Sequence, residues 1–283
     1  MTSLSSPDHD LEDVEVTLNN LKQLNDYGYS LLEQTKDRLQ SESLGKDGYL
    51  LALFISAIAQ VQGIYVLGEN RQYRVAVNQV RTLFEICVTA DLLYCHDSEI
   101  YAYFLVIHNE REKVKRARLL HQDGIANDEQ LSKFEERLKT YEGTFASMHP
   151  KWPDKIPHVI SGKGDKPPLE RGEFSLKQKC QIIDFYSGNI ALESMYDRIY
   201  PFFSDGPHAN LLELSMAFNE SATEINVDID GSQDFDRMYG FARSVFAWHY
   251  ELIKLVREHL FESGDTTMPS WLQLMAKDIG IDI

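Results

Sequence analysis

The chain of 283 residues is poor in cysteine and has no pattern that would join its thiols to one another or to a metal. The three cysteines, Cys87, Cys95 and Cys180, are odd in number and form no CxxC pair. Two of them lie in apolar helical sequence, which is typical of reduced thiols in a core. A chain of this length with 43% hydrophobic residues can bury a substantial core without disulfide or metal cross-links. The cysteine usage therefore predicts a cytoplasmic protein.

Several other signals are missing from the sequence. The first residues, MTSLSSPDHDLEDVEV, contain neither a basic n-region nor an apolar h-region, so we expect no secretory signal. The sequence contains no Walker loop, Rossmann glycine pattern, GxSxG elbow or zinc-type Cys/His set. A near match to a calcium loop over 226–237 places Arg237 where a bidentate Glu is needed, which favours a plain turn. We therefore predict no cofactor and no metal.

Basic residues are in deficit, with 28 Lys and Arg against 44 Asp and Glu, and the formal net charge is −16. This balance weakens the case for nonspecific nucleic-acid binding across the whole surface. It leaves room for one local basic face.

Alternating strand patterns are nearly absent, and apolar residues recur at helical spacing along most of the chain. The predicted fold class is all-α, a single multi-helix bundle of about eight helices. We expect helices at about 10–42, 47–67, 71–95, 98–122, 127–147, 175–200, 209–220 and 234–262, followed by a short amphipathic helix in PSWLQLMAKDIG. Predicted caps support several of these starts, namely Asp47, Ser98, Asn127, Ser175, Pro269 and Ser270.

The predicted bundle domain covers 10–262, between a disordered N-terminus at 1–9 and a C-terminal tail at 263–283. The stretch from Met148 to Phe174 is rich in Pro, Gly and Lys, which would suit a linker between domains. Its apolar residues Trp152, Ile156 and Val159 instead favour one long ordered loop packed on the bundle.

The segment YLLALFISAIAQVQGIYVLG is nearly long enough to span a membrane. It contains Gln60 and Gln62 and is flanked by acidic as well as basic residues. An apolar helix is also what the centre of a large bundle needs, so we expect a buried helix and no membrane contact.

Arg81 and Glu85 stand four residues apart in NQVRTLFEICVTADLLY and share one helix face. Their neighbours are apolar, so we expect the pair to be at least partly buried. A buried ion pair is costly unless its members satisfy each other or a ligand. The pair therefore indicates either a salt bridge between helices or part of a functional site.

The segment HNEREKVKRARLLH is the densest basic cluster in the chain. Arg111, Lys115 and Arg118 fall on one side of the predicted helix. They can form a contact surface for phosphate or RNA, or a solvated face whose charges meet acidic helices.

The segment YDRIYPFFSDGPHANLLELS interrupts a helical pattern with two prolines and a glycine. Tyr200, Ser204 and His208 are spaced by four, although the break should prevent one helix from carrying all of them. The break can therefore present His208 toward a site or simply let it cap the next helix.

Together, the Arg81 to Glu85 helix, Trp152 and the Tyr200, Ser204 and His208 segment resemble a bacterial all-helical family of unknown function. The resemblance covers roughly residues 50 to 220. It implies that Arg81, Glu85, Ser204 and His208 lie near one another, and it implies no activity. The sequence departs from the family pattern at Gly206 and Pro207, where helix-compatible residues are usual.

A looser similarity is to the HEPN group of helical ribonucleases and nucleotide-transferring toxins, which carry Arg followed by four to six residues and His. Arg116 to His121 and Arg243 to His249 match this spacing. In that group His can act as a general base while Arg stabilises phosphorane charge, without a metal. The interior of the second match is VFAW, which favours His249 as a core residue instead.

Two hypotheses of function follow. The first is a defence or toxin-type protein with an RNA- or nucleotide-directed site, whose catalytic residues are Arg81, Glu85, Ser204 and His208. Tyr200, Arg111, Lys115 and Arg118 would bind the substrate, and the activity would be metal-independent RNA cleavage or nucleotide transfer. The second is a non-catalytic interaction module in which these residues are structural and the acidic surface meets a basic protein partner. Aromatic residues are numerous enough for a homodimer.

Overall fold

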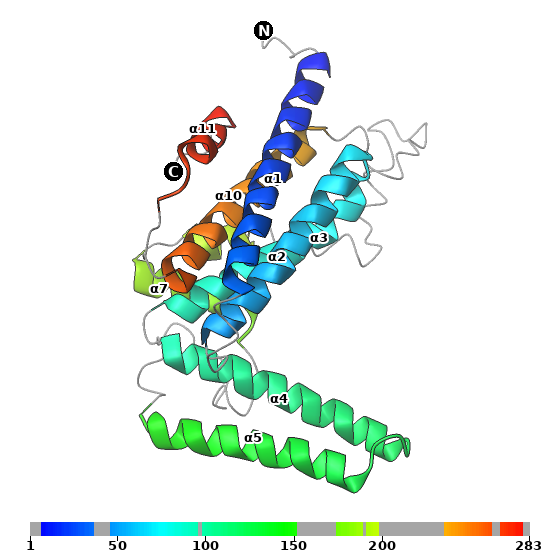
Figure 1. Ribbon diagram of the computed structural model, residues 1–283, viewed down its shortest axis with the longest axis vertical. Coiled ribbons are helices and arrows are strands. Elements are labelled where there is room, and N and C mark those ends of the chain that lie inside the picture. Colours follow the sequence, from blue (N-terminus) through cyan, green and yellow to red (C-terminus); the bar gives the residue numbers. More distant parts are fainter. Residues whose placement is uncertain are drawn as a thin grey trace. The chain divides into compact units, whose positions relative to one another are not determined.

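The fold is all-α, as predicted (Figure 1). The computed structural model describes residues 7–36, 46–95, 98–151, 174–188, 191–197, 235–261 and 267–279. The helices are α1 (Pro7–Lys36), α2 (Lys46–Glu69), α3 (Tyr73–Tyr94), α4 (Ser98–Gln122), α5 (Asp128–Met148), α7 (Leu176–Ser187), α10 (Phe235–Leu260) and α11 (Ser270–Asp278). A shorter helix covers 191–197.

Most predicted helices agree with the structure to within a few residues, because their apolar spacing and caps are strong local signals. Asn127 and Ser175 form the predicted N-caps, each completing a capping box with a Gln three residues later. Asp47 is not a cap, since α2 already begins at Lys46 and Asp47 lies in its first turn. Pro269 occupies the N-cap position of α11 without a side-chain cap bond.

The predicted helix at 175–200 is wrong as one element, because α7 ends at Ser187. Gly188 adopts the left-handed conformation, with φ of 70°, which closes the C-terminus of α7. The carboxylate of Asp184 then accepts bonds from the backbone N–H groups of Leu192 and Glu193, at 3.2 and 2.7 Å. One side chain thus ties the end of α7 to the start of the helix over 191–197.

The described residues fall into two compact units. The first combines residues 1–90 with 195–283, and the second covers 91–194. The last turn of α3 belongs to the second unit. The single domain predicted over 10–262 stays a prediction.

In the first unit, α1 packs along α2 and α10, which also contact each other. We call this packing the apolar crossing; its buried side chains include Leu21, Leu24, Phe54, Ile58 and Phe246. On α3, the ring of Phe84 packs against Trp248 of α10, with centroids 5.0 Å apart. The C-terminal helix α11 contacts α1 through Trp271 and Tyr27, whose rings meet edge to face.

Helix α2 buries one face, at Leu50, Phe54, Ala57, Ile58, Val61, Ile64 and Gly68. Ile55 and Val66 lie on other sides of the helix and are exposed. Among the described helices, α2 alone is long and apolar enough to cross a membrane, and a third of its most apolar stretch is buried. The core helix of a soluble protein can have the same length and composition, so the absence of membrane contact stays a prediction.

The second unit has an aromatic core at one end of the α4–α5 hairpin. Phe104 of α4 packs against Phe145 of α5 and Phe174, with ring centroids 5.3 and 5.1 Å apart. Ile182 of α7 is buried in the same cluster. Phe174 thus packs on the hairpin, as the predicted ordered loop requires, whereas 152–173 of that loop lie outside the described residues.

Candidate functional site

Arg81 and Glu85 form an ion pair along α3. The Nε atom of Arg81 donates to Oε1 of Glu85 at 3.1 Å, as the four-residue spacing predicts. The side chains remain 29% and 42% exposed. The pair is therefore partly buried, as expected, and is not an ion pair sealed inside the core. Solvent can reach both charges.

The other residues of the predicted catalytic set cannot be placed. Tyr200, Ser204 and His208 belong to 198–234, which lie outside the described residues. The same applies to 226–234 of the calcium-like loop at 226–237, whose last three residues belong to α10. The convergence of Ser204 and His208 on Arg81 and Glu85 stays a prediction.

The predicted substrate-binding cations are paired with carboxylates. Arg111 donates to Glu142 of α5 at 2.7 Å, and Arg118 donates to Glu135 of α5 at 2.8 Å. Lys115 is paired with Glu112 on its own helix. These pairs agree with the second interpretation of the basic cluster, a solvated face whose charges meet an acidic helix. A phosphate group would have to compete with these carboxylates.

Glu110 is the most buried charged group of the hairpin. Its side chain is 2% exposed, and its Oε1 atom accepts from Lys113 at 2.8 Å and from Arg137 at 3.1 Å. We call Glu110, Arg111, Arg118, Glu135, Arg137 and Glu142 the ion-paired shaft. These six residues join α4 to α5 beyond the aromatic core.

The turn between α4 and α5 is fixed by a Schellman motif followed by a capping box. Gly124 has φ of 72°, the N–H of Gly124 donates to the carbonyl of His121, and the N–H of Ile125 donates to the carbonyl of Leu120. Asn127 then caps α5 together with Gln130. Nε2 of His121 also lies 2.7 Å from Oδ1 of Asp128 across the turn. Backbone and side-chain hydrogen bonds therefore close the turn.

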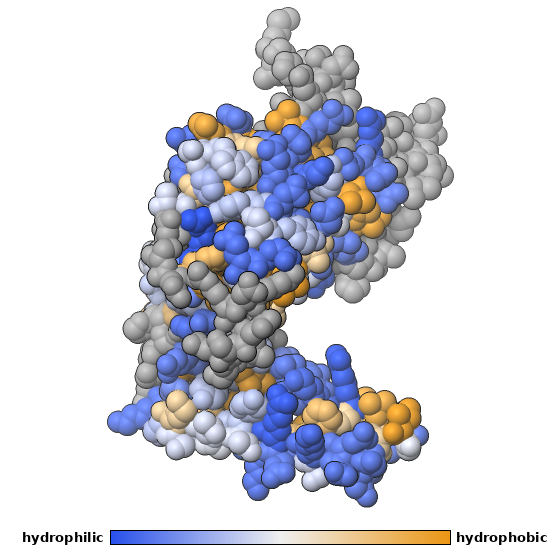
Figure 2. Space-filling model, in the orientation of Figure 1, coloured by the Kyte–Doolittle hydropathy of each residue, from blue (hydrophilic) through white to orange (hydrophobic). Residues whose placement is uncertain are grey.

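This turn presents an apolar tip to solvent. Leu119, Leu120 and Ile125 are 61%, 44% and 72% exposed. In Figure 2 a hydrophobic patch covers the end of the hairpin where the turn lies. Asp123, Asp128 and Glu129 lie within a few residues of these side chains in the sequence and are exposed. The sequence signals of this tip all lie within LLHQDGIANDE, although neither helical spacing nor charge pattern predicts an exposed apolar tip there.

His249 is buried at the apolar crossing. Its ring stacks on Phe54, with centroids 6.3 Å apart, and a side chain at Gly28 would come within 3.4 Å of Nε2. Neither ring nitrogen has a hydrogen-bond partner among the described residues. Burial lowers the pKa of His249 to about 3, so the ring is neutral at pH 7. It is a core histidine, as predicted, and the HEPN resemblance has no support.

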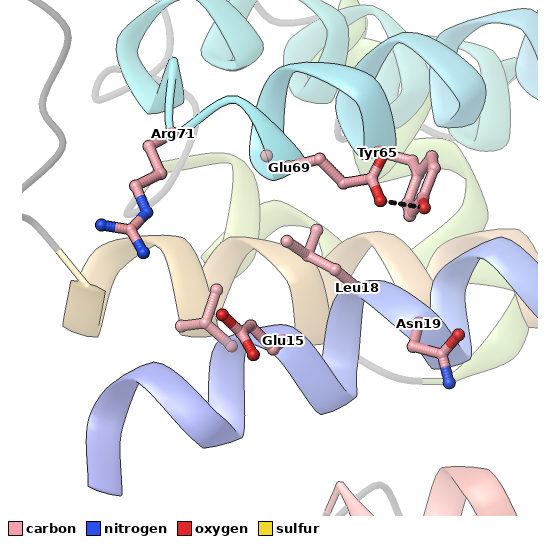
Figure 3. Close-up of a pocket in the computed structure, with 8 residues that line it drawn as sticks. Glu15, Leu18, Asn19, Tyr65, Glu69 and Arg71 are labelled. Atoms are coloured by element: carbon pink, nitrogen blue, oxygen red, sulfur yellow. Dashed lines mark hydrogen bonds between the residues drawn. The ribbon is translucent and has the colours of Figure 1, made fainter. Parts of the chain in front are cut away.

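A pocket of about 320 Å³ lies between the first half of α1 and the end of α2 (Figure 3). Its polar lining comes from Glu15 and Asn19 of α1, Tyr65 and Glu69 of α2, and Arg71 of the following turn. In Figure 3 Arg71 and Glu15 lie on opposite sides of the pocket, and the Tyr65 hydroxyl donates to Glu69. No sequence pattern predicts this pocket, because its two walls are about 50 residues apart in the chain.

Comparisons with known proteins place the chain in one sequence family. A family model described as a family of unknown function (DUF5677) matches residues 47–225. The match contains Arg81, Glu85, the α4–α5 hairpin and the segment with His208. No curated protein and no solved structure matches the chain.

Proposed function

Because this chain belongs to DUF5677, a family of unknown function, we propose a function from its own geometry. We propose that it is a non-catalytic protein-interaction module that binds its partner through the apolar tip of the α4–α5 hairpin. The observation that carries this proposal is the exposure of Leu119, Leu120 and Ile125 on a turn held by the Schellman motif and the capping box.

The proposed partner is a protein with an apolar cleft rimmed by Lys and Arg. Apolar side chains supply the contact area, and the exposed carboxylates of Asp123, Asp128 and Glu129 supply complementary charge. The same carboxylates would repel a second copy of the tip. They also make the tip a poor ligand for anionic lipid or RNA.

Binding to two helical peptides tests this proposal. One peptide of 18 residues carries Leu on one face and Lys on the other, and its counterpart carries Glu in place of Lys. We expect fluorescence anisotropy to show binding of the Lys peptide and none of the Glu peptide. The double substitution Leu119→Ser, Ile125→Ser should weaken binding at least about tenfold, which corresponds to ~1.4 kcal/mol.

The matched control is Leu274→Ser, which changes a leucine of α11 that is equally exposed. It should leave the affinity unchanged. The proposal is wrong if both peptides bind equally, if neither binds, or if the control weakens binding as much as the double substitution does.

The second candidate function is the RNA- or nucleotide-directed site of a defence or toxin-type protein. It is favoured by the solvent access of the Arg81–Glu85 pair and by the family match, which contains both this pair and the Ser204 and His208 segment. An Arg reachable from solvent can stabilise charge on a phosphoryl group, and His can act as a general base.

RNA cleavage and growth inhibition by the wild type test this second function. Arg81→Gln and His208→Ala should each abolish both effects in a folded protein, whereas Arg116→Gln on the exposed face of α4 should not. Equal behaviour of the wild type and His208→Ala, with equal circular dichroism, would remove the catalytic claim.

A further inference from the structure

The pocket between α1 and α2 has the size and the mixed lining of a small-molecule site. Its volume of about 320 Å³ is at the lower end of the range for ligand pockets. Val14 and Leu18 contribute buried apolar surface, and Gly68 also lines the pocket. Carboxylates and a guanidinium line the rest. Such a site can hold a ligand that is apolar at one end and charged at the other.

Arg71 occupies a backbone position that normally favours glycine. Its φ is 57°, its N–H donates to the carbonyl of Gly68 at 3.0 Å, and the N–H of Gln72 donates to the carbonyl of Leu67 at 2.8 Å. This is the left-handed residue of a Schellman motif, where Gly or Asn is usual. A long side chain here carries a conformational cost that glycine would avoid. An arginine at this position therefore indicates that the Arg71 side chain has a role of its own.

The charge of Arg71 is available to a ligand. Among the described residues, Arg71 has no ion pair, and neither has Glu15 on the opposite wall. In Figure 3 Arg71 comes from the turn after α2 and Glu15 from α1, and both line the pocket. A ligand with one positive and one negative group could therefore contact both.

Tyr65 and Glu69 line one wall of the pocket and are hydrogen-bonded to each other. The Tyr65 hydroxyl donates to Glu69, and this bond raises the pKa of Tyr65 to about 12, so the phenol stays a donor. Nζ of Lys22 lies 5.5 Å from the centroid of the Tyr65 ring, on which it makes a cation–π contact. The phenol thus holds the Glu69 carboxylate in place.

We infer that this pocket binds an α-amino acid with an apolar side chain. The ammonium group contacts Glu15, the carboxylate contacts Arg71, and the side chain lies on Val14 and Leu18. Two carboxylates against one guanidinium make the pocket a poor site for a nucleotide phosphate, so this site is separate from both proposed functions.

Calorimetry on the full chain with three related probes tests the inference. L-leucine has both charges, leucinamide has only the ammonium, and 4-methylpentanoate has only the carboxylate. We expect leucine to bind at millimolar concentration or below, leucinamide more weakly, and 4-methylpentanoate most weakly. Binding of leucine no tighter than of 4-methylpentanoate, or no binding of leucine at all, overturns the inference.

Two substitutions test which side chain of the pocket binds each charged group of the ligand. Arg71→Gly should weaken leucine binding about tenfold and change leucinamide binding by less than about twofold, because only leucine has a carboxylate. Glu15→Gln should weaken both ligands alike. Arg116→Gln is the control and should change neither. If Arg71→Gly weakens both ligands equally, the carboxylate does not bind Arg71 and the assignment is wrong.

Arg71→Gly also separates binding from folding. Glycine suits the left-handed position, so this variant should unfold at the same temperature as the wild type or higher. Lower affinity in a protein of equal or greater stability cannot come from misfolding. The Leu119→Ser, Ile125→Ser variant should bind leucine normally, which keeps this inference independent of the function proposed for the hairpin.

Discussion

The apolar crossing of α1, α2 and α10 and the ion-paired shaft of the α4–α5 hairpin hold helices together by opposite means. The crossing buries Leu21, Leu24 and Phe54 completely and includes a neutral histidine. The shaft uses charged side chains that mostly remain open to solvent. The crossing should therefore be sensitive to cavities and to acid, whereas the shaft should be sensitive to salt and tolerant of truncation.

The largest expected effect comes from a cavity in the crossing. Phe54→Ala removes a fully buried ring that lies against His249, which should lower the free energy of unfolding by about 3–5 kcal/mol. Urea denaturation measures this change. The adjacent Ile55→Ala alters an exposed side chain on the same helix and should cost less than about 1 kcal/mol. An equal loss of unfolding free energy in the two variants would mean that α2 does not pack through the face that carries Phe54.

Acid should weaken the crossing through His249. The ring titrates near 6.5 in an unfolded chain and near 3 when folded, so below pH 6.5 the unfolded state binds one more proton. The free energy of unfolding then falls by about 1.4 kcal/mol per pH unit, or ~2 kcal/mol between pH 6.5 and 5.

Urea denaturation at several pH values measures this slope, and His249→Leu is the comparison. The leucine variant should lose the part of the slope that the histidine contributes. If both proteins keep the same slope from pH 6.5 to 5, the ring of His249 is protonated in the folded state and the burial described is wrong.

A smaller effect should follow from loss of the buried carboxylate in the shaft. Glu110→Gln removes the charge that accepts from both Lys113 and Arg137. Those partners are substantially exposed and can turn to water, so we expect a loss of about 1.5 kcal/mol. Hydrogen exchange of the α5 amides measures it. Glu112→Gln, in the exposed pair with Lys115, should change nothing measurable. In 0.5 M salt the difference between Glu110→Gln and the wild type should shrink.

The smallest expected effect concerns two glycines of the hairpin. Gly124→Ala places a side chain at φ of 72° with no atom within 4 Å, so it should cost about 1 kcal/mol of conformational energy alone. Gly143→Ala lies within α5, also without a nearby atom, and should stabilise the helix by up to about 1 kcal/mol. Thermal unfolding should therefore shift in opposite directions. Shifts of the same sign would contradict the turn described.

Local signals determine most of what could be predicted. Asn127 and Ser175 identified two helix starts, and the four-residue spacing identified the Arg81–Glu85 pair. The apolar pattern continues beyond Gly188 and so predicts one longer helix, although a glycine is the usual sign of a helix end.

Contacts between distant residues could not be predicted in the same way. Arg111 reaches Glu142 only because α4 and α5 lie antiparallel in one register, and a sequence pattern does not give that register. The pocket poses the same difficulty, since Glu15 and Arg71 line one pocket only after α1 packs on α2. The interior VFAW did predict a buried His249, because apolar neighbours are a local property.

The length of α4 gives the hairpin a fixed reach. With 25 residues and a rise of 1.5 Å per residue, α4 extends about 37 Å. The aromatic core anchors its first half, and the glycine turn closes its far end. Anything attached at Leu119, Leu120 and Ile125 would be held at a set distance from that anchor, as by a spacer. Inserting seven matched residues into each helix should move the attachment point outward by about 10 Å and leave its chemistry intact.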